Sequence, residues 1–355
     1  MVGCDNLALM ARVYEAAGKR ERLAHYLSAG RIPALLSRLP AKDSLLVLTY
    51  HRVGDADRDP WDPAVFSATA DEFEEQVAYL KRNDYLASLD ESLEFLEGTS
   101  RGKGQRFRVL MTFDDGYLDN YSIAFPILRS HGAQGVFFLC TSLVGSNYVP
   151  WWDRVAFMVK SGKKRKFTLT YPLTFEVDIE RDGLAKSLRN LLNAYKSQEG
   201  ADLDRYLSAV QEAVGCGGVP EAARRFLNWQ EAREMVQGGM AIGAHTHTHP
   251  MLSKISVDEQ RKELERSHDI LRDKLDSKID TLAYPFGSPN AFTNETKNLA
   301  REVGFRAAFS YHGTRANHPE AIDLYDVKRV NVGDQSLPRF RVQTSTSRVT
   351  GNFWP

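Results

Sequence analysis

The stretch Val109-Leu-Met-Thr-Phe-Asp-Asp-Gly-Tyr117 runs largely apolar and then ends in two adjacent carboxylates and a glycine. A short apolar run bounded by a turn residue predicts a buried strand over 109–113, and Gly116 permits a tight turn after it. Adjacent carboxylates at the end of a buried strand repel each other and lose hydration, and a bound cation relieves both costs. For an Asp-Asp-Gly tripeptide taken alone, a solvated turn is the ordinary interpretation.

A second stretch, Gly243-Ala-His-Thr-His-Thr-His-Pro250, places three imidazoles within five residues. His245 and His249 are four residues apart, which would place both rings on one face of a helical turn, with His247 pointing elsewhere. The other pairing, His245 with His247, is the H-x-H pattern of amidohydrolase barrels, although that pair normally lies on the first strand. Both pairings predict a divalent-metal site together with an upstream aspartate.

One carboxylate and two imidazoles leave coordination positions open, as in catalytic rather than structural metal sites. The same ligand set describes an iron(II) oxygenase triad, but there the carboxylate usually lies close in sequence to the first histidine. The second aspartate has no role in oxygenase chemistry. In hydrolysis it can act as a base toward a water molecule beside the metal, which favours a hydrolase.

Bulk composition limits the functional classes. The chain has 355 residues, of which 43% are hydrophobic, enough for an α/β barrel with insertions. Lys+Arg and Asp+Glu number 46 each, which argues against a general nucleic-acid binder. The cysteines Cys4, Cys140 and Cys216 lack metal-type or disulfide-type spacing and favour a reducing compartment. With no signal-peptide core and no apolar run of about 18 residues, we predict a cytoplasmic protein. Peripheral membrane association and the oligomeric state are left open.

Buried strands alternate with helical segments, which predicts an α/β fold with parallel strands and helical crossovers. The predicted strands cover 44–50, 109–113, 135–140, 240–244, 281–283, 306–310 and 327–332. Capping boxes at Thr69–Glu72 and Ser256–Glu259 begin two of the helices. We divide the chain into a helical appendage (1–43), a barrel (44–340) and a C-terminal tail (341–355). Residues 151–225 interrupt the alternation and are predicted to be an insertion over the barrel mouth, with helices around 184–195 and 203–214.

Three motifs together resemble those of a known family. Thr112-Phe-Asp-Asp-Gly116 and the His245, His249, Pro250 pattern are similar to the first two signature motifs of polysaccharide deacetylases, also called NodB-homology domains or carbohydrate esterase family 4. Ala283-Tyr-Pro-Phe-Gly287 resembles the third motif, Arg-x-Pro-aromatic-Gly. The resemblance covers roughly residues 44–335 and matches the insertion weakly. It implies a distorted (β/α)7 barrel with a metal at the C-terminal ends of the strands.

The resemblance also implies roles for individual residues. Asp115, His245 and His249 would hold one divalent metal ion, with zinc as the default and cobalt, nickel, manganese or iron as alternatives. Asp114 would be the general base, and the backbone N–H of Phe286 would donate to the developing oxyanion. The products would be an amine and acetate.

Two departures from the family pattern matter. Ala283 replaces the motif arginine that steers the base, so another group must orient Asp114, and Arg329 is our candidate. The usual C-terminal Leu-x-His motif that supplies the general acid is not evident. The biofilm poly-N-acetylglucosamine deacetylases resemble this chain in an early Tyr-His element whose histidine is the acid. That resemblance makes His51 the candidate acid and His312 the reserve, whereas the plain alternative is that His51 only caps a strand.

Aromatic residues could provide a platform for a sugar ring, and we single out Trp152 and Tyr284, each of which could instead be a core residue. The predicted function is metal-dependent removal of an N-acetyl group from an amino sugar, with a glycan precursor as the favoured substrate. One alternative is a hydrolase of a non-sugar amide or imide, which the missing motif arginine keeps open. The other is a non-catalytic carbohydrate-binding barrel, which the intact carboxylates and histidines disfavour.

Overall fold

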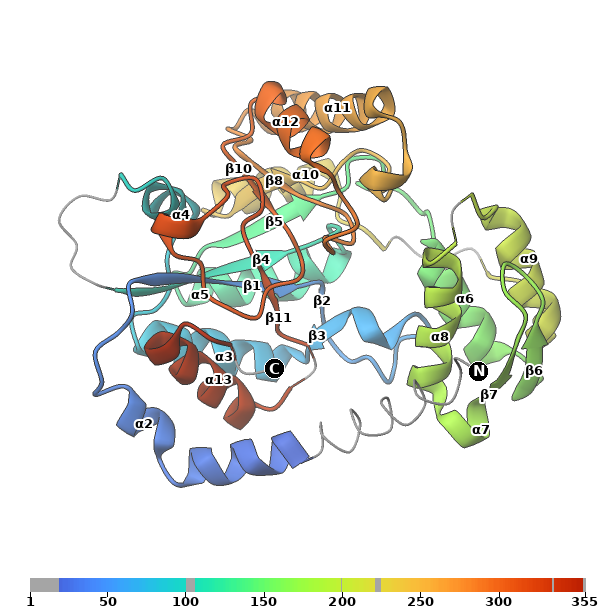
Figure 1. The fold of residues 1–355 in the computed structure, drawn as a ribbon, viewed down its shortest axis with the longest axis horizontal. Helices are drawn as coiled ribbons and strands as arrows, with labels where there is room; N and C mark the ends of the chain where they lie inside the picture. The colour runs from blue at the N-terminus through green and yellow to red at the C-terminus, as the bar shows by residue number, and fades with distance from the viewer. Residues whose placement is uncertain (1–18, 100–105, 199, 221–224, 334, 354–355) are drawn as a thin grey trace.

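The computed structural model describes residues 19–99, 106–198, 200–220, 225–333 and 335–353. Within these residues, the centre of the fold is a seven-stranded sheet whose strand pairings are all parallel (Figure 1). In spatial order the strands are β10 (Ala307–Phe309), β9 (Thr281–Ala283), β8 (Ala241–Ala244), β5 (Gly135–Leu139), β4 (Phe107–Phe113), β1 (Ser44–Tyr50) and β11 (Val330–Asn331). The predicted parallel α/β fold is therefore confirmed.

The two edges of this sheet are linked by one segment of chain. Val327 forms a parallel bridge with Phe309 of β10, and three residues later Val330 pairs with Leu48 of β1. The segment that leads into β11 thus joins the β10 edge to the β11 edge and curls the sheet toward closure, which leaves fewer unpaired backbone groups. This curled parallel sheet is the distorted barrel that the resemblance implied.

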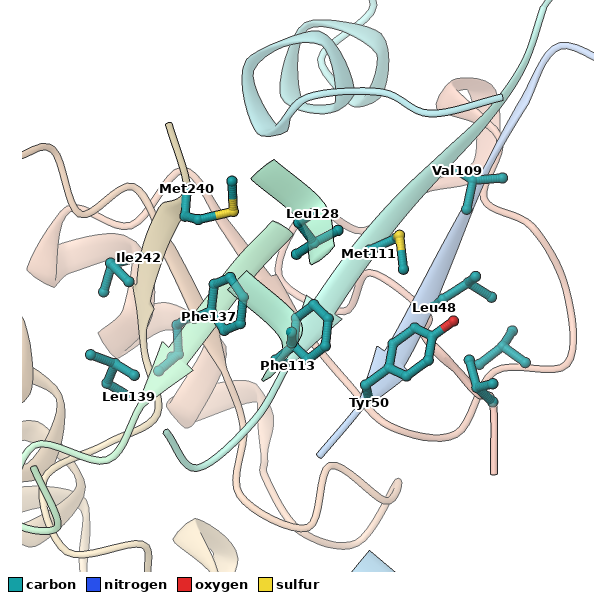
Figure 2. Packing of buried hydrophobic residues seen from close by; sticks show 14 of the residues in the cluster. Leu48, Tyr50, Val109, Met111, Phe113, Leu128, Phe137, Leu139, Met240 and Ile242 are labelled. Carbon is teal, nitrogen blue, oxygen red and sulfur yellow. The ribbon is translucent and has the colours of Figure 1, made fainter. Parts of the chain in front are cut away.

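Successive residues of each strand point to opposite sides of the sheet, and both sides are buried. Figure 2 shows the outward set, in which Tyr50, Phe113 and Phe137 lie side by side beneath the surrounding helices. The inward set includes Leu45, Val47, Leu110, Val136, Phe138 and Phe309, and side chains of α4 (Leu89–Leu96) pack against it. Burial on both sides explains why these strands are unbroken apolar runs.

Helices cover the outer side of the sheet. They are α3 (Ala70–Arg82), α5 (Phe125–Ser130), α10 (Trp229–Gln237), α11 (Val257–Leu275) and α12 (Asn294–Val303). Both predicted capping boxes are present, at the beginnings of α3 and α11. The helical segment that follows β4 begins as a π-helical turn, Asn120–Ala124, and continues as α5.

The first and last described helices pack together on one side of the barrel. Residues 19–29 are helical, α2 (Ile32–Leu36) follows, and α13 (Leu337–Thr350) packs against α2 and α3. Ser336 and Arg339 both bind the Glu21 carboxylate, which connects α13 to the first described helix. The predicted boundary at residue 340 falls inside α13, and residues 1–18 of the predicted appendage (1–43) lie outside the described residues. None of the described helices combines the length and hydropathy needed to cross a membrane.

The insertion has its own small core beside the sheet (Figure 1). It contains α6 (Trp151–Ser161), the antiparallel pair β6 (Lys166–Leu169) and β7 (Phe175–Asp178), α7 (Ile179–Asp182), α8 (Leu184–Lys196) and α9 (Leu203–Val214). Asp153 of α6 pairs with Arg225 at 2.7 Å and accepts the backbone N–H of Asp62 at 3.0 Å. Asp62 belongs to the loop between β2 (Arg52–Val53) and β3 (Phe66–Ala68) at the barrel mouth. This buried link fixes the insertion against the mouth of the barrel.

Gly243 in β8 has no room for a side chain. A Cβ there would lie 2.5 Å from the ring of Phe138 and 2.8 Å from Oγ1 of Thr281, both buried. We expect Gly243→Ala to lower the free energy of unfolding by about 1–3 kcal/mol, the usual cost of overpacking. Urea denaturation measures this change. Gly217→Ala is the control because no heavy atom lies within 4 Å of its Cβ position, and equal stabilities of the two variants would contradict the prediction.

Candidate active site

The polar residues of the predicted site occupy inward positions at the C-terminal ends of strands. Leu110 faces the barrel interior, and two-residue steps lead from it to Thr112 and then Asp114. The same steps lead from Val47 to His51. Parallel strands end at one edge, so these groups converge at the mouth of the barrel. The alternation that builds the core therefore also aims the site residues.

Asp115, His245 and His249 form a compact cluster. One ligand atom from each lies within 4.8 Å of the others. Oδ1 of Asp115 is 3.4 Å from Nε2 of His245 and 3.3 Å from Nε2 of His249, yet it is buried without a hydrogen-bond partner. Nδ1 of His245 lies 2.7 Å from the carbonyl oxygen of Ala283, which leaves Nε2 free to act as a ligand. A buried, unpaired carboxylate oxygen beside two imidazole nitrogens fits a divalent cation.

The electrostatics of Asp115 also favour a cation ligand. Burial alone would raise the pKa of Asp115, but the two imidazoles beside it outweigh burial and hold its pKa well below the usual range. The carboxylate is therefore ionised at neutral pH, the form that coordinates metal ions.

Left-handed backbone, rather than a helical turn, brings the two histidine rings together. Thr246 and His249 have φ of 62° and 63°, and Asp115 has φ of 72°. The loop is held by Glu263, whose Oε2 accepts the backbone N–H groups of His247 and Thr248 at 2.8 and 2.7 Å. The expected helical turn was wrong, because residues 245–250 are not helical. Non-glycine residues in this region of φ are uncommon and often mark functional sites.

His247 is directed away from the cluster. Its Nδ1 lies 2.8 Å from Oγ1 of Thr141, and it is not part of the cluster. The geometry therefore favours the His245 and His249 pairing over the H-x-H alternative.

We expect His249→Gln to weaken zinc binding more than about 100-fold, since even supporting partners of metal ligands contribute about 10–100-fold. His247→Gln, a matched change two residues away, is expected to keep the wild-type affinity. Calorimetric titration of the chelated proteins with zinc compares the two. Equal losses in both variants would restore His247 as a candidate ligand.

Arg329 holds the Asp114 carboxylate at both oxygens. Nη1 donates to Oδ1 at 2.7 Å and Nη2 donates to Oδ2 at 2.8 Å, and both side chains are buried. The guanidinium is held in turn by the carbonyl oxygen of Ser310 and the hydroxyl of Thr112. Burial opposes ionisation of Asp114, but Arg329 outweighs it and lowers the pKa of Asp114 below its ordinary value. Arg329, which directly precedes β11, thus binds Asp114 through both carboxylate oxygens. It orients Asp114 in place of the motif arginine, whose position in this chain is occupied by Ala283.

His51 lies beside the same carboxylate. Its Nε2 is 4.0 Å from Oδ2 of Asp114, and its ring meets Tyr311 edge-on at 5.5 Å. Burial lowers the pKa of His51, although Asp114 and Asp115 oppose this. The reserve candidate His312 lies elsewhere: its Nε2 contacts Lys328 at 3.1 Å and Asp326 at 3.5 Å, and it does not line the cavity.

The two aromatic candidates differ in burial. Trp152 lines the cavity, its ring lies 5.3 Å from that of His249, and its Nε1 donates to the hydroxyl of Tyr117 at 3.0 Å. Tyr284 is fully buried, stacks on Phe292 at 4.1 Å and donates its hydroxyl to the carbonyl of Tyr325. Its ring packing makes Tyr284 mainly a core residue.

Among the described residues, the backbone N–H of Phe286 donates no hydrogen bond, and Phe286 has φ of 62°.

A cavity of about 550 Å³ connects these groups. It is lined by His51, Asp114, Asp115, His245, His249, Trp152, Tyr284, Phe286, Tyr311 and Gly333, by the loop 62–66, and by one face of α8. Sequence patterns predicted an insertion over the mouth but did not indicate that Tyr311 or the α8 residues line the cavity. The sequence around these residues does not differ from that of ordinary surface and core positions.

A parallel barrel whose mouth holds a carboxylate held by arginine, beside an Asp-His-His cluster, has the arrangement of a metallohydrolase. The sequence model of polysaccharide deacetylases matches residues 101–308, more than half of the chain. This protein belongs to the polysaccharide deacetylase family.

Solved structures share the fold. The Streptococcus pyogenes deacetylase PplD, solved with acetate, is 18% identical with a TM-score of 0.55, over 85% of this chain and 98% of PplD. IcaB from Ammonifex degensii is 22% identical with a TM-score of 0.52, over 86% of this chain and 97% of IcaB. A curated relative, YxkH of Bacillus subtilis (strain 168), is 21% identical over 295 residues, which is 82% of this chain and 72% of YxkH.

Proposed function

We propose that this protein is a metal-dependent carbohydrate N-deacetylase that hydrolyses an acetamido group on an amino sugar to an amine and acetate. Family membership supports deacetylation of a carbohydrate. The observation that carries the proposal for this chain is the Arg329-bound carboxylate of Asp114 next to the Asp115, His245 and His249 cluster in one cavity.

In this proposal Asp114 is the general base. Arg329 keeps it ionised and fixes both oxygens, so a lone pair is available to take a proton from the attacking water. The backbone N–H of Phe286 donates to the oxygen that becomes negative as the acetyl carbonyl is attacked. His51 gives a proton to the departing amine: burial lowers the pKa of the imidazole and so eases release of the proton, while the Asp114 and Asp115 carboxylates favour the protonated form. Trp152 packs against His249 and forms part of the wall for the sugar.

A divalent cation held by Asp115, His245 and His249 would supply Lewis acidity toward the acetyl carbonyl and the attacking water. Zinc is the proposed ion, because imidazole and carboxylate ligands suit it, and cobalt, nickel, manganese and iron are alternatives for the same donors.

The test is acetate release from N-acetylglucosamine oligomers and from a UDP-linked N-acetyl sugar, with purified protein supplied with zinc or cobalt. We expect release that a chelator abolishes and added metal restores. Release from the UDP-linked sugar alone would support a precursor substrate, and release from the oligomers alone would support a polymer.

Two results would contradict the proposal. Hydrolysis of a small cyclic imide or formamide, without acetate from any amino sugar, would identify a non-sugar amidohydrolase. Glycan binding without hydrolysis of any substrate would identify a binding protein.

The predicted cytoplasmic location stays a prediction, which fractionation of the native host cells would test.

A further inference from the structure

The face of α8 that borders the cavity carries two cations. Arg189, Asn193 and Lys196 are spaced four and three residues apart, so they share one face of the helix. Leu188, Leu191 and Ala194 are buried and anchor the helix in the core of the insertion. The anchoring holds the cationic face of α8 toward the same cavity as Asp114 and Asp115.

Lys196 lacks an anionic partner among the described residues. Its half-buried ammonium lies 5.8 Å from the ring centre of Trp151 and 5.5 Å from that of Phe286, and it forms no hydrogen bond or ion pair there. The Asp62 carboxylate acts on it electrostatically without direct contact, and burial lowers the pKa of Lys196 despite Asp62. A half-buried cation with no anion in direct contact loses hydration that its surroundings do not fully replace, and a bound anion would relieve this cost.

Lys196 is also close to the reaction centre. The centre of the Phe286 ring lies 5.2 Å from that of the His249 ring and 5.5 Å from Nζ of Lys196. Lys196 and Phe286 line the main cavity and two adjoining hollows, where the cavity opens along α8. A saccharide that crosses the Phe286 ring therefore reaches both the cluster and the ammonium.

We propose that Lys196, assisted by Arg189, binds an anionic group adjacent to the acetamido sugar that is hydrolysed, either on the next saccharide unit or on the anomeric oxygen of that sugar. The substrate class is thus an anionic N-acetylated saccharide, whose charge is a carboxylate or a phosphate. This inference rests on the proposed function and specifies its substrate.

The experiment compares two tetrasaccharides of similar size: tetra-N-acetylchitotetraose (called chitotetraose below), which is neutral, and a hyaluronan tetrasaccharide, which carries carboxylates beside its N-acetylglucosamine units. N-acetylglucosamine 1-phosphate is a third substrate that carries phosphate instead. Acetate release is measured for zinc-loaded wild type, Lys196→Gln and Arg189→Gln. Lys164→Gln is the matched control, since Lys164 is exposed in the insertion and does not line the cavity.

We expect wild type to have a higher kcat/KM for an anionic substrate than for chitotetraose. Lys196→Gln should lower the anionic-to-neutral ratio of kcat/KM by about tenfold or more, the typical effect of losing a charge-assisted hydrogen bond. Arg189→Gln should lower the ratio less, because Arg189 is exposed, and Lys164→Gln should keep the wild-type ratio. Comparing kcat/KM for the hyaluronan tetrasaccharide with kcat/KM for N-acetylglucosamine 1-phosphate shows whether a carboxylate or a phosphate is preferred. A ratio unchanged in both Lys196→Gln and Arg189→Gln would overturn the proposal.

A second readout does not depend on turnover. Calorimetry measures binding of the hyaluronan tetrasaccharide and of N-acetylglucosamine 1-phosphate to chelated protein, so that neither anion can bind through a metal. Binding weakened in Lys196→Gln and retained in Lys164→Gln supports the anion site even if no substrate is hydrolysed, in which case only the proposed function fails. No binding of either anion to wild type, or equal binding to both variants, overturns the inference. Arg189 is exposed, so Arg189→Gln is expected to fold. If Lys196→Gln does not fold, anion binding by Arg189→Gln decides whether the anion site exists.

Discussion

Asp114→Asn is expected to lower the rate of acetate release by about 10³-fold, within the range measured for loss of a general base. The amide has nearly the shape of the carboxylate but has no negative charge and does not take up a proton at neutral pH. Asp115, His245 and His249 are unchanged, so zinc should still bind. Initial rates and calorimetric zinc titrations on the same preparations separate loss of chemistry from loss of metal.

The control for Asp114→Asn is Asp71→Asn, the same change at an exposed position in the first turn of α3. It should keep wild-type activity and zinc affinity. Thermal unfolding of each variant shows that the assayed protein is folded. If Asp114→Asn kept more than about a tenth of the wild-type rate, Asp114 would not be the base.

Arg329→Met should lower the free energy of unfolding by about 3–5 kcal/mol, since removing one partner of a buried ion pair leaves the other charge uncompensated. Arg329 is fully buried and donates hydrogen bonds to Asp114, Thr112 and Ser310. Methionine keeps most of the side-chain volume, so the loss reports on charge more than on packing. Urea denaturation of metal-free protein measures it without a contribution from bound zinc.

The double variant Asp114→Leu with Arg329→Met removes both charges. It should be more stable than Arg329→Met alone, because apolar replacement of a whole buried pair is often close to neutral. It should also be inactive, which separates stability from catalysis. If Arg329→Met lost less than about 1 kcal/mol, or if the double variant were no more stable than the single one, the ion pair would not account for the burial of Asp114.

Local sequence patterns predicted much of the fold. Strand β1 was predicted at its observed bounds, and β9 likewise, because both are apolar runs bounded by polar or turn residues. Capping boxes predicted the beginnings of α3 and α11. These features depend on residues a few positions apart, so the sequence contains all the information that sets them.

Motif spacing also indicated the cluster of Asp115, His245 and His249, which the structure brings within ligand distance. The parallel strands explain why these residues lie together: residues at the C-terminal ends of neighbouring parallel strands must meet at one edge. The choice between His247 and His249 followed from left-handed backbone in the loop after β8, which Glu263 of α11 stabilises from another part of the chain.

The sequence by itself therefore determined the strands, the capped helices and the residue types at the barrel mouth. Only the tertiary structure decided that Arg329 binds Asp114, 215 positions away, because the segment before β11 closes the barrel and carries the guanidinium inside. It also decided that Tyr284 is packed in the core and that α8 turns Lys196 toward the cavity. Such placements depend on how elements that are distant in sequence pack against one another. A short window of sequence does not specify those contacts.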